Sequence, residues 1–152
     1  MKFAYQRLRV NRPIATLRGA MVRYKPILHV RVEHAGVTWP VAGLLDTGAD
    51  DSVFPRSLAE KLEIPLDGLP VCSATSAGGK SVEYAVAPVT LAAHDGIQRC
   101  EWSTLVGFRL DRVKAFPLFG QIGFLQFFTA EFSGDACEVM LTPNSTFPGI
   151  VT

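Results

Sequence analysis

The residues best suited to chemistry in this chain begin with an acidic one that follows an apolar run. Asp46 stands directly after "VAGLL" and before Thr47 and Gly48. Burying an ionised carboxylate without a partner costs enough that such a group usually changes its protonation state instead. Asp46 therefore has a partner or acts through its protonation state. A second interpretation is structural, because an Asp before a glycine-containing loop often caps a turn through its own backbone.

The two residues after Asp46 suit a site that handles protons. The Thr47 hydroxyl can lock the turn by hydrogen bonding, and Gly48 has no Cβ to prevent close approach of a ligand or of backbone. The end of a strand would hold the carboxylate rigidly. These three residues alone leave both interpretations of Asp46 open.

Three segments, taken in chain order, resemble the retropepsin-like aspartic protease family. The string "DTGADDSVFP" resembles the family's active-site segment, "TSAGGKSVEYAVAPVTL" its glycine-tipped flap hairpin, and "FPLFGQIGF" its motif of two apolar residues followed by glycine. The resemblance extends over roughly residues 27–143. It implies a mostly β, retropepsin-like acid protease fold, that is, a closed or folded β-sheet with one or two short helices. It also implies hydrolysis of peptide bonds.

The resemblance implies roles for individual residues. The catalytic segment corresponds to Asp46, Thr47 and Gly48. Thr47 matches a threonine whose hydroxyl reaches the partner's loop across a dimer, and Gly48 matches a glycine whose carbonyl meets the substrate backbone. The residues implied in substrate binding are Gly48, Ala49, Asp50, Ala77, Gly78 and Gly79, and those of the structural second motif are Leu118, Phe119, Gly120 and Gln121.

One position departs from the family pattern. Asp50 matches an acidic residue that binds the substrate main chain and pairs with an arginine after the second motif, but that position holds Gln121. A neutral amide can hydrogen-bond a carboxylate but adds no charge. We therefore expect a weaker internal tie and a weaker dimer, with Arg112 or another basic residue as the substitute.

The number of catalytic motifs predicts the assembly. The chain contains one DTG, whereas the chemistry needs two carboxylates close enough to share a proton, because like charges at that distance do not both ionise. The second carboxylate must come from another copy, related by a two-fold axis.

The sequence thus predicts a homodimeric aspartic endopeptidase that acts on a peptide or protein substrate, with a water activated by paired Asp46 carboxylates and no cofactor. The alternative is a retropepsin-fold binding or dimerisation module with little or no proteolytic activity, which Gln121 favours. A third hypothesis is a zymogen-like precursor. Its N-terminal segment, up to about Gly19, would occupy the substrate groove until it is removed.

Short strands joined by turns are expected to position these residues. Apolar and polar residues alternate in 26–32, and 37–45 returns as a second strand, with Pro40 at a bulge or an edge. The segment starting at Pro55 predicts a short helix. We also expect a hairpin within 69–96 and a strand at 102–108. Residues 116–128 should begin as a strand, break at Gly120 and end in a short helix, and a final hairpin is expected within 129–143. We expect residues 1–22 to form an N-terminal arm or edge strand and 23–152 the protease domain.

Composition narrows the function classes. Apolar residues make up 48% of the 152 residues and charged ones 19%, which suits one folded domain with a core. The net charge of +1 argues against nucleic acid as a partner. The apolar runs are too short for a membrane span, and arginines interrupt the N-terminal segment where a signal peptide would be apolar. A cytoplasmic protein without a membrane partner is expected.

The cysteines and histidines give no metal pattern. Cys72, Cys100 and Cys137 are widely spaced and expected to be reduced and mostly buried thiols. The three histidines are scattered, and the acids around Asp46 lack the ligand spacing of a calcium loop. No metal site is therefore predicted.

Overall fold

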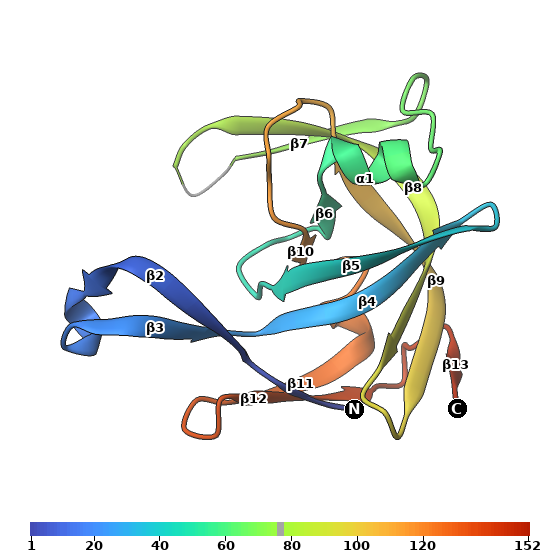
Figure 1. The fold of residues 1–152 in the computed structure, drawn as a ribbon. Helices are drawn as coiled ribbons and strands as arrows, with labels where there is room; N and C mark the ends of the chain where they lie inside the picture. The colour runs from blue at the N-terminus through green and yellow to red at the C-terminus, as the bar shows by residue number, and fades with distance from the viewer. Residues whose placement is uncertain (76–77) are drawn as a thin grey trace.

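A computed structural model of the chain describes residues 1–75 and 78–152. The predicted fold class, mostly β with short helices, is confirmed (Figure 1). The strands are β1 (Lys2–Ala4), β2 (Gln6–Ile14), β3 (Ala20–Lys25), β4 (Ile27–His34), β5 (Val37–Leu45), β6 (Val53–Phe54), β7 (Val71–Thr75), β8 (Ser81–His94), β9 (Arg99–Arg109), β10 (Leu118–Phe119), β11 (Phe128–Ser133), β12 (Glu138–Pro143) and β13 (Ile150–Val151). The helices are α1 (Arg56–Lys61) and two 3-10 turns, η1 (Ala15–Leu17) and η2 (Leu125–Phe127).

The main sheet closes on itself. Within the described residues its strand order is β13-β9-β6-β10-β5-β4-β8-β7, and β8 also pairs with β9. Strands β9, β6, β10, β5, β4 and β8 therefore form a ring. Ring closure leaves these strands few free edges and holds the ends of β5 and β10 side by side.

Strands β4 and β5 follow the alternation of their sequences. They pair antiparallel without a register shift from Ile27 opposite Leu44 to His34 opposite Val37. The apolar residues of β4 are buried, His29 and Arg31 are exposed, and the last two residues, Glu33 and His34, are half-buried, as expected for a strand with one face on the core. Pro40 is exposed in the part of β5 that pairs with β4 only, so it occupies an edge and makes no bulge.

An aromatic core lies against the ends of β5, β6 and β10. Phe54 is fully buried, and its ring meets those of Phe108 and Phe119 edge-on, with centroids 5.8 Å apart in each pair. Phe119 also stacks at a tilt on Phe124, at 4.6 Å. Burying one such ring contributes about 2–3 kcal/mol. This cluster fixes the strands that carry the predicted motifs.

Helix α1 and the turn η2 lie where the sequence predicts them, whereas the turn η1 was not predicted. Helix α1 follows Pro55, and Leu58 and Leu62, four residues apart, are 4% and 0% exposed. The short turn η2 comes after the break at Gly120. Among the described residues no helix has the length and apolar character needed to span a bilayer.

The N-terminal segment forms two separate pairings. Strand β1 adds to the β11–β12 hairpin, whose prediction is confirmed, while β2 and β3 form a two-stranded sheet of their own. In Figure 1 this β2–β3 hairpin extends outward on the side of the turn after β5. Strand β3 runs on to Lys25, and a division of the chain at residue 22 stays a prediction.

The cysteines differ in exposure. Cys100 is buried, Cys137 is half-buried and Cys72 is exposed. The expectation of mostly buried thiols is wrong for Cys72, because every residue of β7 faces solvent. Burial raises the pKa of the Cys100 thiol.

Candidate active site

The second motif holds Asp46 in place from a neighbouring strand. Strand β10 lies parallel to the end of β5, with Leu118 opposite Leu44 and Phe119 opposite Leu45. The backbone N–H of Asp46 donates to the carbonyl oxygen of Phe119 at 3.0 Å. Two segments more than seventy residues apart in the sequence therefore meet at the backbone of Asp46.

The Asp46 carboxylate is half-buried and only partly engaged. Its Oδ1 accepts a hydrogen bond from the Gly48 N–H at 3.0 Å, and its carbonyl oxygen accepts one from the Ala49 N–H at 3.3 Å. Among the described residues no hydrogen bond reaches Oδ2. Thr47 and Gly48 are exposed. Asp46 thus caps its own turn with one oxygen and leaves the other available, so the two interpretations of this residue are compatible.

Gln121 makes a contact that the sequence did not predict. Its side-chain Nε2 donates to the carbonyl oxygen of Thr47 at 3.0 Å, and its backbone N–H donates to the carbonyl oxygen of Ala49 at 2.9 Å. The amide in the family's arginine position therefore supports the turn after Asp46. The predicted tie to the Asp50 carboxylate, which is exposed, is not formed.

Arg112 does not act as the substitute for the missing arginine. Its guanidinium lies 3.7 Å from the Glu60 carboxylate of α1. Within the described parts of the chain the Asp50 carboxylate has no ion pair, although its backbone carbonyl accepts from the Ile122 N–H at 2.8 Å. The backbone of this loop is well held while its charge is left uncompensated.

Gly120 allows the two loops of the site to touch. A Cβ on this residue would lie less than 3.0 Å from the carbonyl oxygens of Asp51 and Ala49. Gly43 plays a similar part on β5, where a Cβ would lie 2.5 Å from the Phe119 ring. These close approaches are the physical reason for the glycine after the two apolar residues of β10.

Ser52 is a site-supporting residue that sequence reasoning missed. It is 1% exposed. Its Oγ donates to the Ile122 carbonyl at 2.9 Å and accepts from the Gly120 N–H at 3.1 Å. One hydroxyl therefore connects Gly120, in the second motif, with Ile122, just after it. The available signal was a small polar residue directly before the apolar pair of β6, which is weak by itself.

Asp51 is also engaged in a way that the sequence did not indicate. The Tyr84 hydroxyl donates to its carboxylate, and Tyr84 is 3% exposed. Burial and the neighbouring Asp51 raise the pKa of the Tyr84 hydroxyl above its ordinary range. The ring fits beside Gly107, where a Cβ would clash with it. This contact ties the loop after Asp46 to β8. In the described residues no three His, Cys, Asp or Glu side chains are grouped to hold a metal ion.

The predicted hairpin is present at the expected place. Strands β7 and β8 pair from Val71 opposite Ala85 to Thr75 opposite Ser81. Gly78 and Gly79 are exposed, and Gly79 has a positive φ of 74° that favours glycine. Ala77 lies outside the described residues. The pairing supports a hairpin with a glycine-rich turn, and the part its tip plays in substrate binding stays a prediction.

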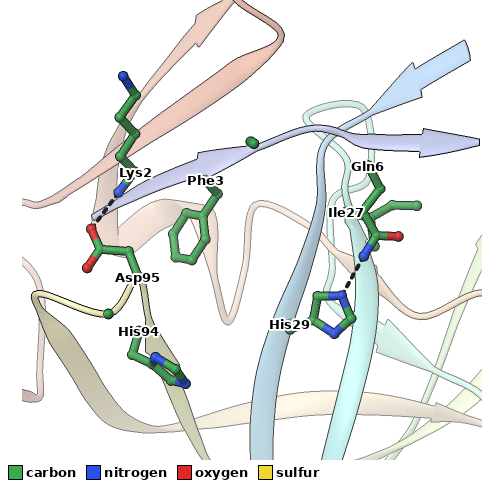
Figure 2. Close-up of a pocket in the computed structure, with 9 residues that line it drawn as sticks. Lys2, Phe3, Gln6, Ile27, His29, His94 and Asp95 are labelled. Atoms are coloured by element: carbon green, nitrogen blue, oxygen red, sulfur yellow. Dashed lines mark hydrogen bonds between the residues drawn. The ribbon is translucent and has the colours of Figure 1, made fainter.

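A cavity of about 400 Å³ lies elsewhere, between β1 and the turn after β8 (Figure 2). Lys2 donates its backbone N–H to Asp95 Oδ2 at 2.8 Å on one side, and Gln6 bonds His29 on the other. None of the residues that line this cavity belongs to the Asp46 turn. The candidate site of one chain is an exposed turn rather than the floor of this cavity.

Comparison with known proteins identifies the family. A family model described as aspartyl protease matches residues 30–114, which is more than half of the chain. The chain therefore belongs to the aspartyl protease family. This confirms, at the level of the family, the resemblance that its motifs indicated. The matched range contains the Asp46 turn, α1 and the β7–β8 hairpin, and it ends before β10.

Among solved structures, the chain is similar to a retropepsin-like aspartic protease from Rickettsia conorii. The two share 19% sequence identity over 93% of this chain and 95% of the other, with a TM-score of 0.44. A comparison with curated protein sequences gives no significant match.

Proposed function

We propose that this protein is an aspartic endopeptidase that works as a homodimer, with Asp46 of each copy as the catalytic carboxylate. The observation that carries the proposal is the state of Asp46 in a member of the aspartyl protease family. Its backbone is fixed by β10, one carboxylate oxygen holds the turn, and the other oxygen makes no hydrogen bond within the described residues. A carboxylate held in this way can face a second carboxylate.

The need for a second copy follows from the other acids near Asp46. The Asp51 carboxylate accepts the Tyr84 hydroxyl, and Asp50 is exposed at the rim of the loop. Neither replaces a second, equivalent carboxylate facing Asp46. Two-fold symmetry supplies one, because the same turn from the partner would meet it.

The proposed reaction uses one proton and one water between the two carboxylates. The ionised carboxylate takes a proton from the water as the water oxygen bonds to the peptide carbonyl carbon, and the protonated carboxyl group donates to the carbonyl oxygen. The tetrahedral intermediate then breaks its C–N bond as the carboxyl group that took the water's proton passes it to the leaving nitrogen. The other carboxylate takes a proton from one hydroxyl of the intermediate, which leaves a carboxylic acid and an amine and restores one proton to the pair. No covalent bond to the enzyme forms, and the apparent pKa values belong to the pair.

Substrate contacts are proposed from exposure around the turn. Gly48 and Asp50 are exposed, and within the described residues the Gly48 carbonyl oxygen and the Asp50 N–H make no hydrogen bond, so these two backbone groups are open to an extended peptide. The backbone groups of the half-buried Ala49 are already bonded within the site. The exposed Ile122, 53% accessible, offers apolar surface beside the turn. The β7–β8 hairpin, with Gly78 and Gly79 in its turn, would close over the peptide from the other side; Ala77, which lies outside the described residues, is proposed with them from the sequence alone.

A second candidate is a binding or dimerisation module of the same fold with little or no proteolysis. The observation that favours it is the neutral Gln121, which supports Thr47 and leaves Asp50 without an ion pair in the described chain. A weaker dimer would leave the two Asp46 carboxylates apart for most of the time. Such a protein would bind peptides without cutting them.

Digestion of a denatured protein mixture between about pH 4 and pH 7 tests the two candidates. The substitution Asp46→Asn removes the titrating carboxylate, and Asp67→Asn, at an exposed turn, is the matched control. We expect the parent and the control to cut at equal rates and Asp46→Asn to lose at least about a hundredfold in rate. Equal cleavage by parent and Asp46→Asn would contradict the endopeptidase, and peptide binding without cleavage in all three would support the module.

A further inference from the structure

The β2–β3 hairpin carries a concentrated positive charge. Residues 6–25 contain six basic residues and no acidic one: Arg7, Arg9, Arg12, Arg18, Arg23 and Lys25. The other nine basic residues of the chain stand against fourteen acidic ones, so the remainder has a formal charge of −5. The small net charge of the whole chain therefore hides two parts of opposite sign.

The hairpin is poorly supported by its own chain. Its strands pair only with each other in the described residues, and none of its six basic side chains makes an ion pair or hydrogen bond there. An isolated two-stranded ribbon is marginally stable in water. Its backbone edges are open, with a register shift between Arg9 and Ile14. These features are typical of a segment that is completed by a contact with another molecule.

Exposed apolar side chains accompany the charges on this hairpin. Leu17 and Met21, near its turn, are 49% and 45% accessible, and Tyr24 is 50% accessible. Arginine and tyrosine are enriched where proteins meet other proteins. A hairpin that needed only solubility would not expose these large apolar groups.

We propose that the β2–β3 hairpin is a basic arm that binds the acidic surface of a second copy of this chain. This inference rests on the proposed function, which places the second copy opposite Asp46. In Figure 1 the hairpin extends on that side, and farther from the body than the turn after β5 or the β11–β12 turn. A copy that brings its Asp46 to face the first must therefore meet the arm.

Charge complementarity selects the second copy as the occupant. The β11–β12 hairpin extends on the same side and exposes Glu131 and Asp135. Hydrogen bonds from the Ser133 hydroxyl and from backbone N–H groups lower the pKa of Asp135, so this residue is ionised near neutral pH. A two-fold axis forms this contact twice, once for each arm on the negatively charged body of the other copy.

The dissociation constant of the dimer, measured by sedimentation at 50 mM and 500 mM NaCl, tests the arm. The variant Arg12→Glu/Arg18→Glu reverses two exposed charges of the arm, and Arg31→Glu/Lys61→Glu reverses two exposed charges on β4 and α1 as the matched control. We expect the arm variant to raise the dissociation constant at least about tenfold at low salt and about threefold at high salt, and the control to change it less than about threefold. Leu17→Ser/Met21→Ser should weaken the dimer equally at both salt concentrations.

The outcomes separate the arm from the protease. A dimer that cuts peptides but has the same dissociation constant in parent and arm variants would overturn the arm alone. A chain that stays monomeric and inactive at the highest concentration would overturn both proposals. Titrations with labelled duplex DNA and with vesicles containing phosphatidylserine complete the test, since an arm variant that changes only these affinities would assign the arm to a polyanion instead. Urea unfolding of each variant checks that it is folded.

Discussion

The substitution Ser52→Ala tests how the second motif supports Asp46. The Ser52 hydroxyl is buried, donates to the Ile122 carbonyl and accepts from the Gly120 N–H. Alanine removes both bonds without adding volume. The Ile122 carbonyl keeps the Ser52 backbone N–H as its donor, at 3.0 Å, whereas the buried Gly120 N–H loses its partner.

The expected cost follows from this asymmetry. An unsatisfied buried donor costs about 1–3 kcal/mol, while loss of a bond whose acceptor remains satisfied costs about 0.5–1 kcal/mol. The small void left by the oxygen adds little. We therefore expect Ser52→Ala to lower the free energy of unfolding by about 2–3 kcal/mol, which corresponds to roughly 5–10 °C in the unfolding temperature of a chain of this size.

Urea unfolding followed by tryptophan fluorescence measures this cost, because Trp102 is 1% exposed in the folded chain, while Trp39, the other tryptophan, is already 39% exposed. Ser103→Ala is the matched control, since Ser103 is exposed and, in the part of the chain that the structure describes, its hydroxyl meets only the Thr90 hydroxyl, at 3.3 Å. It should change stability by less than about 0.5 kcal/mol. Peptide cleavage should fall in Ser52→Ala through kcat, because Gly120 precedes the residue that supports Thr47. Equal stability of the two variants would refute the bridging role of Ser52.

Two further predictions concern other contacts of the fold. Gly120→Ala should lower the free energy of unfolding, measured by thermal unfolding, by about 3–5 kcal/mol and abolish cleavage, because the added Cβ would meet backbone oxygens. Gly134→Ala is the control and should be nearly neutral, because a Cβ at Gly134 would have no atom within 4 Å. For Asp95, three backbone N–H donors lower its pKa from 3.8 to about 2. Its contribution to stability is therefore complete above about pH 4 and is lost as the pH falls toward 2, so Asp95→Asn should be about 1 kcal/mol less stable than the parent at pH 6 and equal to it near pH 2. A gap between parent and Asp95→Asn that stays constant with pH would contradict the hydrogen-bond explanation.

Local patterns predicted the elements well where one residue decides the conformation. The alternation in β4 and β5 requires one face to be buried, and Pro55 before Leu58 and Leu62 starts α1. Gly120, where the sequence predicts a break, directly follows the last residue of β10. Each of these signals lies within a few residues of its effect, so the sequence displays it directly.

Contacts between distant residues could not be predicted in the same way. The bond between Ser52 and Gly120 joins residues 68 positions apart, and that between Gln121 and Thr47 joins residues 74 apart. Both depend on β10 lying between β5 and β6, which no local pattern encodes. Motif resemblance placed Gln121 opposite Asp50, but a neutral amide has no charge to hold it there, and its Nε2 donates to the carbonyl of Thr47 instead.

The electrostatics of the proposed dimer connect the site with the arm. Bringing two Asp46 turns together also brings two exposed Asp50 carboxylates to the same region, and Gln121 adds no positive charge to offset them. In the described chain Arg112 is directed to Glu60 instead. Association of two such surfaces is opposed unless cations arrive from another part of the molecule. The β2–β3 hairpin, with six basic residues on the side from which the partner approaches, can supply them. Cleavage at low enzyme concentration should for that reason decline as salt is added, and should recover when the enzyme concentration is raised, because salt would weaken the assembly and leave the chemistry of the paired carboxylates intact.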